Sequence, residues 1–382
     1  MRCGRVNFIQ SIPKTISFLN RRISVSSSIS SHLSTSAPNS PKFQRIFSGI
    51  QPTGTIHLGN YVGAILPWKK LQDDNQEVIL EIADLHSITL PQDPKNLSRS
   101  ILEMTASLIA CGINADKVLL FQQSAVSAHA ELSWILGCTC TMARLSHLHA
   151  FKEKSSTLKD VPVGLFLYPV LQAADILAYK ATHVPVGEDQ VQHIQLTQEL
   201  ARMFNKRFGN CFPIPHTLIT DNAYSRLKSL RDPNKKMSKS DPDPKSRISI
   251  LDRPEVVNEK IKKAVTDFTS EIYYDAENRP GVSNLLSIHS IVSNKEIEEI
   301  CSESKGLNTV QYKSVVADAI NEHLQPIQSK YEYLVSEVGY IEEILQNGAD
   351  RAKEISNRTL EEVKEKIGFF TMEKSSRIAS KH

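Results

Sequence analysis

The sequence predicts an α/β protein, in which a parallel sheet flanked by helices is followed by an all-α C-terminal part. Over residues 42–232, short apolar runs alternate with segments of helical periodicity, which is typical of a parallel sheet with crossover helices. Prolines punctuate a polar stretch over 233–248, so we expect a loop-rich joint there. Over 249–382 a strand pattern is almost absent, and long charged helices are expected.

Three apolar runs are the expected strands of the first part: residues 46–50, 78–83 and 118–121. Between the second and the third, residues 97–111 have helical spacing. Because ligands bind at the carboxyl ends of the strands in such sheets, the polar residues that follow each run are candidate site residues. They are Gln51 after the first run, Asp84 and His86 after the second, and Gln122, Gln123 and Ser124 after the third.

The turn after the first strand predicts a phosphate site. Gln51-Pro52-Thr53-Gly54 is followed by His57-Leu58-Gly59-Asn60, which leads into an amphipathic helix over 61–71. Free N–H groups and the positive end of a helix converge where such a turn meets the helix. Gly59 would let a flat ring or a phosphate lie against the backbone, and His57 and Asn60 would add neutral hydrogen-bond donors. Alone, the same turn also fits an ordinary strand–helix connection.

A second stretch, KMSKS at residues 236–240, lies on the polar loop between Pro233 and Pro242. Lys236 and Lys239 can bring mobile point charges to a polyphosphate. On its own the stretch also fits a solvated basic loop.

Together, the two stretches resemble the signatures of the class I aminoacyl-tRNA synthetases. HLGN stands at the position of the family's HIGH motif, with Asn60 replacing the last histidine, and KMSKS is intact. From about Arg45 to the C-terminus, the sequence is similar to that of tryptophanyl-tRNA synthetases of the bacterial and organellar type. The resemblance implies a Rossmann-like catalytic domain over 42–232, the KMSKS loop as the joint, and an anticodon-binding helical domain over 249–382 whose last helix packs back on the catalytic domain. It also implies a homodimer.

The reaction implied by the resemblance joins tryptophan to tRNA(Trp) at the expense of ATP, which is released as AMP and pyrophosphate. The tryptophan carboxylate attacks the α-phosphorus, so positioning and electrostatics carry the catalysis. Mg²⁺ arrives with ATP, and no metal site on the protein is expected. The implied catalytic residues are Gln51, Lys154, Lys236 and Lys239. The implied ATP contacts are Gln51, His57, Gly59, Asn60, His86, Lys236, Met237, Ser238, Lys239 and Ser240.

One carboxylate, Asp175, interrupts the apolar helical run over 168–177. An aspartate in such a face is costly to bury unless it is paired, so it either caps or salt-bridges a neighbour or receives a donor from a ligand. An indole N–H only donates and a carboxylate only accepts. The resemblance gives Asp175, in the AAD run, the role of reading the indole. Gln172 differs from the bacterial members of the family, in which Met is frequent at this position.

A short strand, a glycine and a helix start follow over 184–190. Val184, Val186 and Ile176 would line an apolar slot, as ordinary core residues also do. By resemblance, Gln190 would meet the ammonium group of the substrate. The full set of expected tryptophan contacts is Phe47, Gly49, Tyr168, Gln172, Asp175, Ile176, Val184, Val186 and Gln190.

The N-terminal segment differs from the rest of the chain in composition. Residues 1–41 hold eleven Ser and five basic residues but no acidic one, and the first carboxylate of the chain is Asp73. This composition is typical of an organellar transit peptide, with a disordered tail as the alternative. It does not separate the mitochondrial matrix from the chloroplast stroma, and it is compatible with both.

Charge and cysteine content narrow the function classes further. The chain carries +3, and removing the five positive charges of residues 1–41 leaves residues 42–382 at −2. Any tRNA contact must therefore come from a local basic patch, for which the stretch 226–247, with eight Lys or Arg against three Asp, is the candidate. The six cysteines lack the spacing of a zinc site. No apolar run approaches the ~18–20 residues of a membrane span, so no membrane segment is expected.

Three alternatives stay open on the sequence. A tyrosyl-tRNA synthetase shares the fold and both signatures, although the AAD and GEDQ runs favour tryptophan. A small-molecule adenylyltransferase would have less use for the long helical C-terminal part. An inactive paralogue could serve as an RNA-binding or splicing protein, but both signatures are intact.

Overall fold

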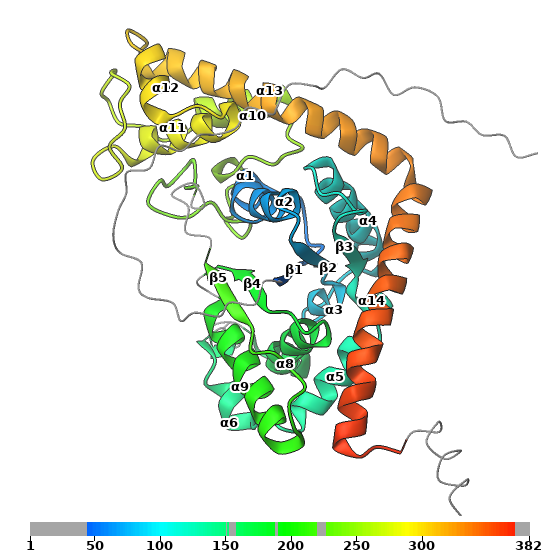
Figure 1. Ribbon diagram of the computed structural model, residues 1–382. Coiled ribbons are helices and arrows are strands. Elements are labelled where there is room, and N and C mark those ends of the chain that lie inside the picture. Colours follow the sequence, from blue (N-terminus) through cyan, green and yellow to red (C-terminus); the bar gives the residue numbers. More distant parts are fainter. Residues whose placement is uncertain (1–43, 150, 153–157, 188–189, 220–226, 371–382) are drawn as a thin grey trace, which may run out of the picture. The chain divides into compact units, whose positions relative to one another are not determined.

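Five parallel strands form one sheet, in the order β3-β2-β1-β4-β5. The computed structural model describes residues 44–149, 151–152, 158–187, 190–219 and 227–370. Figure 1 shows helices on both sides of the sheet. The predicted α/β class with a parallel sheet is confirmed. The strands are β1 (Arg45–Ile50), β2 (Glu77–Ile82), β3 (Leu119–Gln122), β4 (His183–Val186) and β5 (His216–Ile219).

The observed strands follow the predicted runs within one residue, except for β5. That strand directly follows Pro213 and Pro215. It pairs only with β4 at the edge of the sheet. Its first two residues, His216 and Thr217, are polar, so it lacks the apolar run that marks the other strands.

The register divides the sheet into two faces, because side chains alternate along a strand. Phe47 pairs with Ile79, which pairs with Leu119, and all three side chains belong to one buried apolar cluster. Val78 and Leu80, which alternate with them, belong to a second cluster. The sheet therefore separates two cores.

Helices close both cores. The first cluster is completed by α5 (Ala128–Gly137), α8 (Val163–Ala178) and α9 (Val191–Phe208). The second is completed by α2 (Leu66–Asp73), α4 (Pro94–Ala110) and the C-terminal helices. These are α10 (Pro254–Lys262), α11 (Pro280–Ser293), α12 (Ile297–Glu303), α13 (Thr309–Ser336) and α14 (Val338–Ile367). The predicted all-α C-terminal part is confirmed.

Side-chain caps fix where two of the long helices begin. The Asp93 carboxylate accepts the backbone N–H of Lys95 at 2.9 Å at the start of α4. At the start of α13, Asn308 and Gln311 each bond the other's backbone N–H. Such caps satisfy N–H groups that have no partner within the helix.

The helix predicted over 61–71 begins earlier and is irregular. It starts as α1 (Leu58–Asn60), continues as a π-helical turn, η1 (Tyr61–Ile65), and only then becomes α2. π-helical turns are rare and are often found at functional sites. This one directly follows the turn that the sequence marks as a phosphate site.

Residues 43–382 form one compact unit, and the domain boundaries predicted at 232 and 248 stay predictions. The predicted transit peptide over 1–41 lies outside the described residues. Within the part of the chain that the structure describes, no helix has the length and apolar character to cross a membrane.

The last helix, α14, packs against β3, α5 and α8, and in Figure 1 it runs along the β3 edge of the sheet. Gly348 makes this approach possible. A Cβ atom on Gly348 would collide with the carbonyl group of Leu120 in β3. Helix and strand backbones therefore meet where a side chain is absent.

We expect Gly348→Ala to lower the free energy of unfolding by about 1–3 kcal/mol, because the added methyl group must push α14 off β3. Gly339→Ala in the same helix is the matched control, since a Cβ atom there meets nothing within 4 Å. That variant should be neutral or slightly more stable. Urea denaturation of both variants measures the difference, and equal stabilities would contradict the close-approach argument.

Candidate active site

The structure brings the two signature stretches together, although they lie far apart in the sequence. The N–H of Leu58 donates to the carbonyl of Ile248 at 2.8 Å, and the N–H of Ile250 donates to the carbonyl of Ile56 at 3.0 Å. The segment after KMSKS is thereby tied to the start of α1. A Cβ atom on Gly59 would lie 3.5 Å from Cβ of Met237. The KMSKS loop therefore lies directly beside the glycine turn.

His57 is a neutral hydrogen-bonding group at this junction. Burial, together with the smaller effect of the nearby charges of Lys239, Arg247 and Lys236, lowers its pKa from 6.5 to about 4. Its Nδ1 accepts the backbone N–H of Asn60 at 3.3 Å and so caps α1. With Nδ1 as the acceptor, the proton of the neutral ring is on Nε2. His57 can therefore donate a hydrogen bond without adding a charge.

The two lysines of KMSKS have no carboxylate partner among the described residues. Their neighbour Lys235 pairs with Asp232 at 3.1 Å, but neither Lys236 nor Lys239 forms such a pair. Burial lowers the pKa of Lys239, and the charge of Arg247 adds to this. Its Cε atom lies 3.3 Å from where a Cβ atom of Gly54 would stand. These cations stand beside a glycine turn with no acidic residue to neutralise them, as a polyphosphate site requires.

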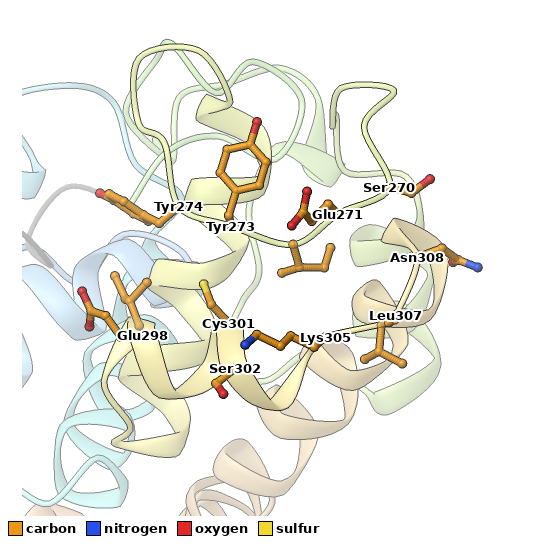
Figure 2. Close-up of a pocket in the computed structure, with 13 residues that line it drawn as sticks. Ser270, Glu271, Tyr273, Tyr274, Glu298, Cys301, Ser302, Lys305, Leu307 and Asn308 are labelled. Atoms are coloured by element: carbon orange, nitrogen blue, oxygen red, sulfur yellow. The ribbon is translucent and has the colours of Figure 1, made fainter.

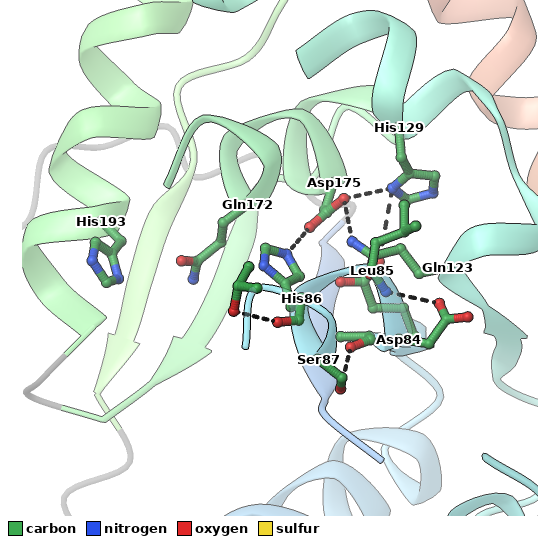
Figure 3. A network of polar contacts seen from close by, with 12 residues as sticks. Asp84, Leu85, His86, Ser87, Gln123, His129, Gln172, Asp175 and His193 are labelled. Atoms are coloured by element: carbon green, nitrogen blue, oxygen red, sulfur yellow. Dashed lines mark hydrogen bonds and ion pairs between the residues drawn. The ribbon is translucent and has the colours of Figure 1, made fainter. Parts of the chain in front are cut away.

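A second group of polar residues surrounds Asp175 in α8 (Figure 3). The carboxylate is fully buried and accepts three hydrogen bonds from three different segments. His86 of α3 (Asp84–Ser87) approaches Oδ2 through Nε2 at 2.7 Å. His129 of α5 approaches Oδ1 through Nδ1 at 2.6 Å, and Gln123 donates to Oδ1 at 3.0 Å. The polar groups are thus directed at a single charge inside an apolar core.

Further contacts fix the orientation of the donors. Gln123, at the start of the 3₁₀ turn η2 (Gln123–Ala125), accepts the N–H of Leu85 at 3.1 Å, which turns its amide nitrogen toward Asp175. His129 Nε2 lies 2.8 Å from the hydroxyl of Tyr179. Burial alone would raise the pKa of Asp175, but the hydrogen bonds from His129 and His86 hold it below its ordinary range. Asp175 is therefore a carboxylate, whose Oδ1 atom accepts two hydrogen bonds and whose Oδ2 atom accepts one.

The other residues expected around tryptophan surround this group. Tyr168 lies 3.2 Å from His193 Nε2 through its hydroxyl, and His193 Nδ1 lies 2.9 Å from Gln190 Oε1. Gln172 donates to the same Gln190 oxygen at 3.4 Å. Phe47, Ile176 and Val184 belong to one apolar cluster, with Val186 packed against it, and Gly49 is exposed in β1. The structure therefore collects the nine predicted residues on one face of the sheet and on the helices that cover it.

Some predicted residues stand apart from these groups. Gln51 is exposed directly after β1. His86, expected as an ATP contact, has its ring on Asp175 instead of at the glycine turn, and its ATP role stays a prediction. Lys154 lies outside the described residues.

Sequence reasoning missed three members of the Asp175 group: Glu81, His129 and Tyr179. Each stands alone in an apolar stretch, where a polar side chain resembles an isolated core residue. The ligand-type atoms of Glu81, His129 and Asp175 lie within 4.8 Å of one another. Because His129 and Asp175 are already hydrogen-bonded to each other, the geometry gives no reason to replace the expectation of no metal site.

The helical part holds a separate hollow of about 760 Å³ (Figure 2). Tyr273, Tyr274 and Glu271 line it from the segment before α11, and Cys301 and Lys305 line it from α12 and the turn after it. None of the residues predicted for ATP or tryptophan lines this hollow.

Comparison with known proteins identifies the class. A family model described as tRNA synthetases class I (W and Y) matches residues 40–325. The chain belongs to this family and is an aminoacyl-tRNA synthetase.

Its relatives narrow the class further, and the predicted resemblance to tryptophanyl-tRNA synthetases is confirmed. The chain is 46% identical to a tryptophan–tRNA ligase of Caldanaerobacter subterraneus subsp. tengcongensis, covering 85% of this chain and 98% of that protein. It is 42% identical to a chloroplastic/mitochondrial tryptophan–tRNA ligase of Arabidopsis thaliana, covering 86% and 83%. A crystal structure of tryptophanyl-tRNA synthetase from Campylobacter jejuni, complexed with ADP and tryptophan, superposes with a TM-score of 0.76 at 30% identity, covering 85% and 100%.

Proposed function

We propose that this protein is a tryptophan–tRNA ligase, which activates tryptophan with ATP and transfers it to tRNA(Trp). The observation that carries the proposal is the pairing of two sites within one sheet domain. Two lysines without a carboxylate partner among the described residues stand beside a glycine turn, and a buried carboxylate stands among apolar core residues. The first suits a polyphosphate, and the second suits an apolar amino acid with a hydrogen-bond donor. The names of the relatives, matched over most of their length, support the same activity.

In the proposed first step, the tryptophan carboxylate attacks the α-phosphorus of ATP, and pyrophosphate leaves. Negative charge grows on the leaving group, where Lys236 and Lys239 would neutralise it. His57 would donate a hydrogen bond through Nε2 without repelling these cations, because its low pKa keeps it neutral. Mg²⁺ would enter bound to ATP, and Lys154 would be a further phosphate contact.

Tryptophan would lie with its indole toward Asp175. The Oδ2 atom of that carboxylate accepts only the hydrogen bond of His86 and can also accept the indole N–H, and Phe47, Ile176 and Val184 supply the apolar walls. Gln190, which His193 orients through a contact of 2.9 Å, would meet the ammonium group. Placing the ammonium and indole ends at different helices would fix the substrate carboxylate toward ATP.

The proposal is tested by ATP–pyrophosphate exchange with each of the twenty amino acids. Tryptophan alone should support exchange, whereas exchange with tyrosine would point to the sister specificity and no exchange would point to an inactive paralogue. Lys239→Ala should then lose about 2–4 kcal/mol of transition-state stabilisation while tryptophan affinity changes little.

The matched control for that variant is Lys235→Ala. Lys235 stands four residues away on the same loop, but it is highly exposed and paired with Asp232. Its loss should leave the exchange rate nearly unchanged. If the two variants behave alike, Lys239 has no specific role at the pyrophosphate.

Targeting of the protein to an organelle is the second part of the proposal. It is supported by the basic, acid-free composition of residues 1–41 and by the chloroplastic/mitochondrial name of one relative. The helical part over 249–382 would then bind the anticodon of an organellar tRNA, with the basic stretch around KMSKS near its acceptor end.

We expect residues 1–41, fused to a fluorescent protein, to direct it to mitochondria, plastids or both, because organellar import selects basic segments without acidic residues. The control fusion carries the same segment with Arg21 and Arg22 changed to Glu, which should stay in the cytosol. Diffuse fluorescence of the unchanged fusion would show that the segment is not a targeting signal.

A homodimer is the third part, and exposed apolar side chains support it. Trp134 of α5 is 76% exposed, Met142 of α6 (Met142–Ser146) is 77% exposed, and Val163 of α8 is 69% exposed. These helices pack on one another, so the three residues lie on adjoining elements. An apolar patch of this kind on a folded protein is typical of an interface.

Trp134→Glu combined with Met142→Glu should convert a dimer into a monomer, because charges would be buried unpaired at the interface. Sedimentation equilibrium measures the mass. Tyr333→Glu is the control, since Tyr333 is 64% exposed on α13, a different element, and it should leave the dimer intact. A monomeric wild-type protein at micromolar concentration would refute this part.

A further inference from the structure

Glu81 is a carboxyl group on a sheet face that is otherwise apolar. It stands in β2 with Gly49 of β1 and Phe121 of β3 as its register partners. The row before it on the same face is Phe47, Ile79 and Leu119, all buried. Glu81 is only 3% exposed, so a charge here would lie inside the core.

The absence of a side chain at Gly49 makes room for Glu81. A Cβ atom on Gly49 would lie 2.8 Å from Cγ of Glu81 and 3.0 Å from its Oε1. Gly49 itself is exposed at the pocket. The Glu81 carboxyl group therefore lies beneath the floor of the tryptophan pocket proposed above.

The surroundings of Glu81 contain acids and histidines but no cation that pairs with it. The Oε2 atom of Glu81 is buried, and no donor among the described residues forms a hydrogen bond to it. His129 Nδ1 is 3.8 Å away and is already committed to Asp175 at 2.6 Å. The titratable groups around it are Asp84 and His86 from α3, His129 from α5, Asp175 from α8, and Tyr179 directly after α8.

Two ionised carboxyl groups whose oxygens lie within 4.8 Å would place two negative charges together in a low-dielectric core, where the nearby histidines, His86 and His129, are both bonded to Asp175. A proton on one of the two carboxyl groups removes this repulsion. Asp175 has three hydrogen-bond donors that favour its anion, whereas Glu81 has none. Burial raises the pKa of Glu81 well above its ordinary value, and the Asp175 charge raises it further.

We propose that Glu81 is a positioning residue of the tryptophan pocket: a neutral carboxylic acid that donates its proton in a hydrogen bond to Asp175. The pair then carries one negative charge, and the orphan Oε2 atom gains a partner. The hydrogen bond comes from β2 and is directed at the Oδ1 side of Asp175, beside His129, so Oδ2 keeps a position for the indole N–H. This inference rests on the proposed tryptophan activity only for its kinetic consequences.

The first test is spectroscopic and does not depend on activity. The infrared difference between the wild-type protein and Glu81→Gln at neutral pH should contain the carbonyl stretch of a protonated carboxylic acid. Glu77→Gln is the control, because Glu77 lies on the same strand but pairs with Arg45 at 2.9 Å near the surface. A carboxylate band in place of the acid band in the Glu81 difference spectrum would overturn the proposal.

The second test is stability against pH. The folded pKa of Glu81 lies above the unfolded value of about 4.5, so the folded state holds the proton more tightly. The resulting contribution to the free energy of unfolding is complete below pH 4.5 and declines as pH rises toward the folded pKa. Wild-type stability should therefore fall more steeply over this window than that of Glu81→Gln, and parallel curves would count against the proposal.

The third test is kinetic. Glu81→Gln keeps a donor of similar size, so the KM for tryptophan in pyrophosphate exchange should stay within about three-fold. Glu81→Met removes the donor that β2 directs at Asp175, so that KM should rise ~10-fold with little change in kcat or in the KM for ATP. If Gln is as harmful as Met, the charge of Glu81 is needed and the proposal is wrong. A wild-type protein without tryptophan-dependent exchange would refute the proposed function but leave the first two tests readable.

Discussion

The buried charge of Asp175 is the constraint on which the arrangement of the site depends. A carboxylate inside an apolar core is tolerated only if donors surround it. Here the donors come from α3, η2 and α5, which follow β2 and β3 at their carboxyl ends, while the charge itself comes from α8. One ion therefore ties together the ends of two strands and two covering helices. The same network makes the pocket rigid, because none of its members can turn without leaving a polar atom unpaired.

The nucleotide side of the site is held differently. Backbone hydrogen bonds join residues 56–58 to residues 248–250, so the glycine turn and the segment after KMSKS have a fixed relation. The lysines on the loop keep their freedom, since no described carboxylate binds Lys236 or Lys239. The proposed amino-acid site is thus held by a closed hydrogen-bond network, whereas the proposed phosphate site has lysines that no described carboxylate holds. This division suits a reaction in which one substrate must be recognised and the other must lose pyrophosphate.

Much of this could be predicted from the sequence, for identifiable reasons. The apolar runs of β1 to β3 and the capped helices α4 and α13 are local signals, and so are the two signature motifs. The contacts of Asp175 could not be predicted, because they depend on which helix faces which strand end. His129 and Glu81 each appear alone in an apolar stretch, and only the register of β2 beside β1 shows that Glu81 fills the space left by Gly49. The edge strand β5 was missed because His216 and Thr217 make half of it polar, so no apolar run marks it.

The packing of α14 has a consequence for the order in which the protein can assemble. Leu345 contributes to the core on one side of the sheet, and Ala352, Leu360 and Val363 contribute to the core on the other. Both cores are therefore completed by the last helix of the described chain. A ribosome releases the N-terminal strands first, but β3 gains its covering helix only when the part of α14 around Gly348 has emerged. Until then the β3 edge of the sheet stays uncovered, so the sheet and both cores are completed only after the helical part has been made.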